Sequence, residues 1–147
     1  MKRFLMVGAT ALLLATGAQA DMIKTSTDKS VAEAMDALEA AVDKAGATVF
    51  ARVDHTKGAE NVGLSMDHAQ TLIFGNPKLG TPAMVDDIRA SLYLPLKVAI
   101  YSPKEGGVVI AYDDPADVFA GLDIPADAKY VKMMQGALAK LTGAAAN

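Results

Sequence analysis

Two histidines that bracket a polar segment are the residues best suited to bind a metal. His55 follows Asp54, and His68 follows Met66 and Asp67, so nitrogen, sulfur and oxygen ligands would meet if the ends of this segment converge. Histidine and methionine without cysteine suit copper, whereas histidine with a carboxylate suits zinc. Haem is a weaker version of this hypothesis, because no Cys-x-x-Cys-His attachment sequence is present. The alternative is that both histidines are solvent-facing loop residues.

Adjacent carboxylates offer a second kind of chemistry. Asp86-Asp87 and Asp113-Asp114 are paired acids, and a buried acid with a raised pKa could act with His68 in acid–base catalysis. Turns and helix caps explain both pairs equally well. The sequence has no cysteine, no serine in a Gly-x-Ser-x-Gly context and no Gly-rich phosphate loop. We therefore rank an enzyme below a binding protein and assign no catalytic residue.

Three residues on two β-rich segments could form the wall of a binding site. Lys97 and Tyr101 lie in the segment 96–101, and Tyr112 ends the segment 108–112. The turn between the segments, Ser-Pro-Lys-Glu-Gly-Gly, predicts a β-hairpin. Tyrosine combines apolar area with one hydrogen-bonding group, so a face shared by these side chains would suit a ligand pocket or a subunit contact.

The elements that position these residues follow from periodicity. Ser30 and Glu33 form a capping box that begins a helix, and apolar residues then recur every three or four positions until Gly46. Alternation over 48–54 predicts a strand that buries Val49, Ala51 and Val53 on one face. We further expect strands at 22–25 and 70–74, a helical turn or loop within 55–66, and helices at 115–122 and 127–141. A helix is also expected from Thr81, with Pro82 at its first position and an apolar stripe formed by Met84 or Val85, Ile88 and Leu92.

These elements predict one α+β domain spanning residues 21–143, followed by a frayed tail at 144–147. The sheet is expected to be antiparallel or mixed, with about five strands and helices on at least one face. Methionines at helix-stripe positions, such as Met35, Met84 and Met134, are expected to fill the core.

The N-terminus has the order of a secretory signal peptide. Lys2 and Arg3 precede an apolar segment, and Ala18-Gln19-Ala20 is a small-residue cleavage site, so we expect a bacterial protein exported to the periplasm or secreted. Cleavage after residue 20 would lower the net charge from −3 to −5. Such a surface does not attract nucleic acid or anionic lipid, and no membrane span is expected after cleavage.

Three motifs together resemble the domain of unknown function 302 family. They are Ile73-Phe74-Gly75-Asn76-Pro77 followed by Gly80-Thr81-Pro82, then Leu94-Pro95-Leu96-Lys97 leading into 98–101, and the segment 108–112 running into Asp113-Asp114-Pro115. The resemblance spans roughly residues 23–122. It implies a small α+β domain, often secreted in bacteria, that forms a homodimer, and it implies no established reaction. Tyr93 departs from the family pattern, in which an acidic residue is expected before the Leu-Pro pair.

The Gly-Asn-Pro segment has a structural and a functional interpretation. Glycine permits positive φ and proline fixes φ, so the segment is expected to form a loop of fixed shape. Alternatively, Asn76, the loop amides and Lys97 form a small pocket for an anion or a carbonyl beside the helix that follows. Our first hypothesis is therefore a non-enzymatic module that binds a small anionic or apolar ligand through Asn76, Lys97, Tyr101 and Tyr112. The metal or haem binder built on His55, His68 and Met66 comes second, and no cofactor is assigned.

Overall fold

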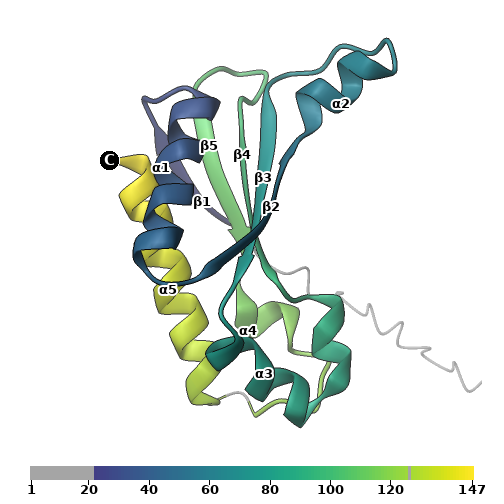
Figure 1. Ribbon diagram of the computed structural model, residues 1–147, viewed down its shortest axis with the longest axis vertical. Helices are drawn as coiled ribbons and strands as arrows, with labels where there is room; N and C mark the ends of the chain where they lie inside the picture. Colours follow the sequence, from purple (N-terminus) through teal and green to yellow (C-terminus); the bar gives the residue numbers. More distant parts are fainter. Residues whose placement is uncertain (1–21, 126) are drawn as a thin grey trace, which may run out of the picture.

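One antiparallel sheet of five strands organises the protein. The computed structural model describes residues 22–125 and 127–147, and the expected signal peptide lies outside these residues. The strand order is β1-β5-β4-β3-β2, and every neighbouring pair is antiparallel (Figure 1). The α+β prediction with five strands is confirmed. The strands are β1 (Met22–Thr27), β2 (Thr48–Asp54), β3 (Ala69–Gly75), β4 (Leu96–Tyr101) and β5 (Val108–Asp113).

Helices α1 (Val31–Lys44) and α5 (Lys129–Ala146) cover one face of this sheet (Figure 1). The capping box is confirmed: the Ser30 backbone N–H donates to Glu33 Oε2 at 2.9 Å, and the Glu33 N–H donates to Ser30 Oγ at 3.3 Å. Apolar side chains at helical spacing on α1 pack against the alternate residues of β3, β4 and β5 that point toward the helix. The core therefore forms between the apolar stripe of the helix and one face of the sheet. Its fully buried members include Met35, Leu38, Val42, Leu72, Val98, Ile100 and Ile110.

The register of β2 differs from the sequence prediction. Val49 pairs with Phe74 and faces the core, but a β-bulge follows, and Ala51 pairs with Ile73 on the opposite face. Arg52 is therefore turned toward α1, where its Nη1 lies 2.6 Å from Asp36 Oδ1. The predicted buried set of Val49, Ala51 and Val53 is wrong beyond Val49. A bulge adds one residue to a strand, so every side chain after it changes face.

The helix after β3 begins four residues earlier than predicted. Helix α3 spans Pro77–Asp86, with Asn76 as its N-cap and Pro77 in its first turn, and Pro82 lies inside it. Asn76 and Pro77 are the favoured residue types for these two positions, so the break predicted as a loop is itself the helix start. A short 3-10 helix, η1 (Ile88–Leu92), follows. The apolar stripe predicted here is also wrong, because Ile88 and Leu92 are exposed.

The C-terminus is ordered, contrary to the predicted frayed tail. Helix α5 continues through Gly143 to Ala146, and Ala145 is fully buried in the core. Thr27 Oγ1 donates to the Ala146 carbonyl at 2.8 Å, and Lys29 Nζ donates to the Ala145 carbonyl at 2.9 Å. These bonds satisfy carbonyls that a helix end otherwise leaves unpaired. Contacts with β1 therefore keep the last turn helical.

A smaller packed unit, here called the lobe, extends beyond one end of the sheet. It comprises α3, η1, α4 (Pro115–Val118) and the chain up to residue 125, packed on the first turns of α5 (Figure 1). The apolar residues buried between the lobe and α5 are Ala83, Ala90 and Phe119 of the lobe and Val131 and Met134 of α5. Most are small or come from short helices, so the lobe has less apolar surface to bury than the main core.

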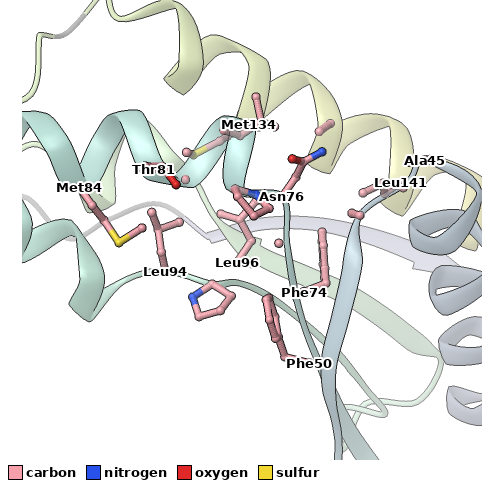
Figure 2. Close-up of a pocket in the computed structure, with 17 residues that line it drawn as sticks. Ala45, Phe50, Phe74, Asn76, Thr81, Met84, Leu94, Leu96, Met134 and Leu141 are labelled. Carbon is pink, nitrogen blue, oxygen red and sulfur yellow. The ribbon is translucent and has the colours of Figure 1, made fainter.

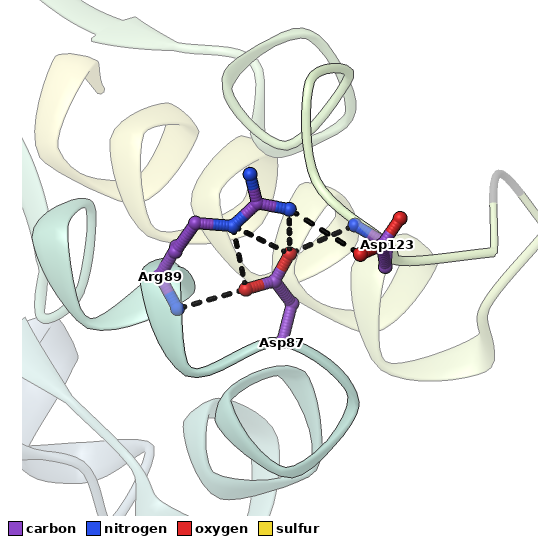
Figure 3. Close-up of polar contacts among 3 residues, drawn as sticks. All are labelled: Asp87, Arg89 and Asp123. Atoms are coloured by element: carbon purple, nitrogen blue, oxygen red, sulfur yellow. Dashed lines mark hydrogen bonds and ion pairs between the residues drawn. The ribbon is translucent and has the colours of Figure 1, made fainter.

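A hydrogen-bonded group formed by Asp87, Arg89 and Asp123, here called the carboxylate lock, supports the lobe. The carboxylate of Asp87 accepts from the Arg89 guanidinium, with Nη2 at 2.6 Å, and from the Asp123 backbone N–H at 2.9 Å (Figure 3). The Arg89 backbone N–H also donates to it at 2.9 Å. These hydrogen bonds, first of all those from the Arg89 side chain, hold the pKa of Asp87 well below its usual range. The lock joins η1 to the loop that follows α4.

None of the helices within the described residues is both long and apolar enough to cross a membrane.

Candidate functional site

A cavity lies where the core and the lobe meet, lined by residues of β3, α3, α5 and the end of α1. Its volume is about 320 Å³, which falls at the lower end of the range for small-molecule sites. In Figure 2, Phe50 and Phe74 lie at one end and Met84 at the other, with Leu96 between them. Helix α5 closes a further side with Met134, Ala137 and Leu141. Most lining side chains are apolar, so the cavity suits an apolar ligand.

Asn76 brings a polar group to this apolar surface. As the N-cap of α3, its Oδ1 accepts from the Lys78 backbone N–H at 3.0 Å. This bond fixes the orientation of the amide, and no hydrogen bond within the described residues uses Nδ2. Thr81 supplies the other side-chain polar group among the lining residues. A ligand in the cavity would therefore meet one amide donor and one hydroxyl on a largely apolar wall.

Gly75 and Pro95 line the cavity next to Phe50. A Cβ on Gly75 would lie 3.4 Å from Phe50 Cε2 and 3.5 Å from Pro95 Cβ. Gly75 and Gly80 do not have positive φ, so the conformational argument made for these glycines from sequence is wrong. Both Cβ separations are ordinary van der Waals contacts, and the Phe50 ring reaches the cavity where β2 bulges.

The four residues predicted to bind a ligand do not converge. Asn76 lines the cavity. Tyr112 is buried on the core face of β5, and burial raises its pKa. Lys97 and Tyr101 lie on the opposite face of β4, and Lys97 Nζ donates to the Pro95 carbonyl at 3.4 Å. Lys97 instead lines a separate hollow of about 100 Å³, together with Asp113. Residues one apart on a strand point to opposite faces, which separates Lys97 from the cavity residue Leu96.

The predicted metal ligands lie in an exposed segment. His55 begins α2 (His55–Asn61), and its Nε2 lies 3.0 Å from Thr71 Oγ1. His68 lies just before β3 and borders a separate hollow with Thr56 and Ser102. Across residues 22–125 and 127–147, no group of three or more histidine, cysteine or acidic side chains could hold a metal ion. Methionine is not among these residue types, so a metal site built on His55, His68 and Met66 stays a prediction.

Three of the four paired acids, Asp86, Asp87 and Asp114, have structural partners. Asp87 forms the carboxylate lock, and Asp86 Oδ2 accepts from the Tyr130 hydroxyl at 2.6 Å. Burial, together with Asp86, raises the pKa of Tyr130 to about 12. Asp114 caps α4 and accepts from Gln135 Nε2 at 2.7 Å. Helix capping thus accounts for Asp87 and Asp114, as the alternative interpretation from sequence proposed.

Sequence analysis did not identify most of the residues that line the cavity, because their apolar types and spacing are also those of ordinary core residues. Phe50, Leu79, Met84, Leu94 and Ala137 are separated by up to 87 positions, and no motif joins them. One signal was the Gly75-Asn76-Pro77 motif, beside which the sequence hypothesis placed a small pocket, and all three of its residues line the cavity. The other was the run of small residues where α1 ends, since Ala45 and Ala47 leave space beside Phe74.

Three Brucella proteins match part of this chain. Proteins of Brucella suis and Brucella abortus named "Fluoride-specific ion channel FluC 1" are each 35% identical over 95 residues, which is 65% of this chain and 37% or 35% of theirs. A Brucella melitensis protein named "Fluoride-specific ion channel FluC 2" matches to the same extent. The chain thus spans about a third of the length of these relatives.

A solved structure shares the fold. It is described as the crystal structure of uncharacterized conserved protein DUF302 from Bacillus stearothermophilus, and it covers 84% of this chain and 96% of its own with a TM-score of 0.75. The sequence identity is 18%, so this likeness concerns the fold alone. The family described as "Domain of unknown function DUF302" matches residues 22–146, which include the whole sheet, the lobe and the cavity. The chain therefore belongs to the DUF302 family.

Proposed function

We propose that this protein is a non-enzymatic binding module of the bacterial periplasm that holds a small, mainly apolar ligand in the cavity between its core and its lobe. The observation that carries the proposal is the cavity of about 320 Å³, lined mostly by apolar side chains. An apolar concave site with few polar groups is the usual form of a small-molecule site. The N-terminal sequence supports export to the periplasm.

The size and polarity of the cavity limit the ligand. A water molecule occupies about 30 Å³ in the liquid, so the cavity has room for roughly ten non-hydrogen atoms. Asn76 has its Oδ1 engaged by the α3 backbone and presents an amide donor, so the ligand should carry a hydrogen-bond acceptor. A short aliphatic carboxylate meets both conditions. No cationic side chain is among the lining residues, so a compact inorganic anion fits less well.

The direct test is native mass spectrometry of protein expressed from its full sequence and purified from the periplasmic fraction. We expect a cleaved N-terminus and an organic adduct. Octanoate is then added and its binding is measured by calorimetry, with octylamine as a probe that has the same chain and no acceptor. We expect octanoate to bind and octylamine not to bind. Failure of both probes, with no adduct retained, would contradict the proposal.

Two pairs of variants connect binding to the cavity. Ala137→Phe places a ring inside the cavity, whereas Ala139→Phe makes the same change at an exposed position two residues later on α5. Only Ala137→Phe should abolish octanoate binding. Asn76→Asp keeps an N-cap acceptor for α3 but replaces the amide donor with a carboxylate, so it should weaken octanoate binding while leaving the fold intact. Equal binding by all variants would place the ligand elsewhere.

The Brucella relatives favour a second candidate function, as an accessory domain of a membrane ion channel. Only residues 1–21 and 147 lie outside the DUF302 match, so most of the 95 residues shared with these relatives fall within the domain. Proteins named as fluoride channels therefore contain a related domain beside other sequence. The test is fluoride efflux from proteoliposomes that contain the Brucella suis protein with or without its matching segment. This chain, added to the truncated channel, should restore the original rate, and an unchanged rate would reject the candidate.

A further inference from the structure

The hydrophobic pattern of residues 85–92, here called the exposed segment, is inverted. This segment runs from the last turn of α3 through η1, and its large aliphatic side chains face solvent. Val85 is 76% exposed, Ile88 72% and Leu92 75%. The buried members are instead an acid and an alanine, since Asp87 is 7% exposed and Ala90 is fully buried. A folded domain normally places these residue types the other way round, and departures from the pattern are expected at functional sites.

The contacts of the buried members hold the exposed segment in this orientation. The Asp87 carboxylate accepts from the Arg89 guanidinium and from the Asp123 backbone N–H (Figure 3). Ala90 packs in the apolar cluster between the lobe and α5. The aliphatic side chains therefore cannot turn inward without breaking the carboxylate lock. Eight residues of mostly helical chain span roughly 15 Å, so these side chains occupy one small part of the surface.

The residue types of the exposed segment favour lipid over protein as its partner. Protein interfaces are enriched in aromatic residues, methionine and arginine, whereas leucine and valine are under-represented among the residues that dominate their binding energy. The apolar side chains exposed here are all aliphatic, which suits a contact that depends on buried area and not on shape. Tyr93 follows directly, is 40% exposed and packs edge-on against Phe119, with ring centroids 6.3 Å apart. Tyrosine is enriched at the boundary between a bilayer and water, because it combines an apolar ring with a hydroxyl.

The start of the domain lies at the same end of the molecule as the exposed segment. Strand β1 begins at Met22, which pairs with Asp113 at the end of β5, and α4 of the lobe follows directly. Residues 1–21 therefore join the domain at the end of the sheet that carries the lobe (Figure 1). Their apolar segment is predicted to direct export, and a signal peptide is membrane-inserted until it is cleaved. On the export proposed above, the lobe is the part of the domain next to the membrane when the chain is released.

The charges around the exposed segment indicate which lipid fits. Asp86, Asp87 and Asp123 carry three negative charges here, against one positive charge on Arg89. The Arg89 guanidinium is engaged by Asp87 and Asp123, so it is not oriented toward a lipid phosphate. An anionic headgroup would be repelled by this surface, whereas a zwitterionic headgroup would not.

We propose that the exposed segment docks this protein on the surface of a membrane of zwitterionic lipid. Val85, Ile88 and Leu92 enter the outer part of the acyl-chain region, and the carboxylate lock keeps the backbone that presents them in place. The contact is peripheral and reversible, because three side chains bury far less apolar area than a spanning helix. It is separate from the ligand proposal, because these three residues are not among those that line the cavity.

The test is flotation with phosphatidylcholine vesicles in a density gradient, without octanoate. The protein is the periplasmic preparation described above, and its cleaved N-terminus is verified first, because an apolar N-terminal segment would itself bind lipid. Wild-type protein should float, and Leu92→Glu should lower its partition into vesicles about tenfold or more. Leu64→Glu is the matched control, because Leu64 is 67% exposed in the loop between α2 and β3. It should float as the wild type does.

Tryptophan fluorescence measures the same contact without adding a charge. The chain contains no tryptophan, so Leu92→Trp introduces a single reporter. Its emission should shift to shorter wavelength when phosphatidylcholine vesicles are added, whereas the emission of Leu64→Trp should not. Adding phosphatidylglycerol to the vesicles should weaken binding at low salt, and raising the salt concentration should restore it, because salt screens the repulsion.

Several outcomes would overturn the proposal. Wild-type protein that does not float would reject it, even if octanoate binds and the cavity proposal stands. Flotation of Leu92→Glu equal to that of the wild type would place the contact elsewhere on the molecule. Equal shifts for Leu92→Trp and Leu64→Trp would show that the contact is not confined to the exposed segment. Binding only to vesicles that contain phosphatidylglycerol would show that charge, and not the aliphatic side chains, drives it.

Discussion

The main core and the lobe are built in different ways. The core is an apolar layer between two long helices and the sheet, and its side chains are excluded from solvent. The lobe consists of short helices with small buried residues, and polar contacts such as the Asp87 lock and the Tyr130–Asp86 bond hold its parts together. The cavity lies where these regions meet. The core and the lobe have separate buried clusters, and the space for a ligand lies along the boundary between them.

The comparison predicts that the largest loss of stability comes from the core. Leu38→Ala removes a fully buried side chain of α1 from a layer that cannot collapse around the space, so the free energy of unfolding should fall by about 2–5 kcal/mol. Urea denaturation followed by circular dichroism measures this change. Ala40→Gly on the exposed side of α1 is the control, and it should cost only about 1 kcal/mol. Equal losses for the two variants would show that the core is not the main source of stability.

Removing the carboxylate lock should affect the lobe selectively. Asp87→Ala leaves the Asp123 N–H and the Arg89 guanidinium without their acceptor, so η1 and the loop after α4 should open more often. Hydrogen exchange followed by mass spectrometry should show faster exchange over residues 83–94 and 119–124, with β3, β4 and β5 unchanged. Asp117→Ala, which removes an exposed carboxylate from α4, keeps both the lock and the Tyr130–Asp86 bond and serves as control. Uniform acceleration across the sheet would mean that the lobe and the core unfold as one unit.

The lock also predicts a pH dependence. Because Arg89 lowers the pKa of Asp87 in the folded state, the unfolded state binds a proton more readily than the folded state does. The stabilisation is complete above the unfolded pKa of about 3.9 and is lost as the pH falls toward the folded pKa. The melting temperature of wild-type protein should therefore decrease more steeply below pH 4 than that of Asp87→Ala. Parallel curves for the two proteins would contradict the assignment.

Capping interactions at the ends of the core helices should produce the smallest effects. Ser30→Ala removes the N-cap acceptor of α1 and should cost about 1 kcal/mol, whereas Ser30→Asp keeps an acceptor and should cost less. Thr27→Val deletes the hydroxyl that bonds the Ala146 carbonyl and should also cost about 1 kcal/mol. Chemical denaturation measures both. A negligible loss for Thr27→Val would mean that water satisfies the end of α5 as well as β1 does.

Sequence reasoning succeeded where a pattern depends on neighbouring residues. The capping box at Ser30 and the periodic stripe that follows predicted α1, and the paired glycines at 106–107 predicted the β4–β5 hairpin. It failed where a distant contact decides the outcome. The stripe expected around Ile88 is exposed because the chain changes to a 3-10 helix after Asp87, whose carboxylate is bound by a residue 36 positions away. The end of α5 is ordered by Thr27, 119 positions earlier.

The candidate site shows the same division. By itself the sequence determined the α+β class, the family and one of the two polar residues that line the cavity, Asn76, because caps, periodicity and motifs are local properties of the chain. Only the tertiary structure decided which side chains share a face. The bulge in β2 directs Phe50 to the cavity and turns Arg52 toward α1, while strand alternation separates Lys97 from the cavity. A cavity between two packed regions depends on how far apart those regions come to rest, and packing alone determines that distance.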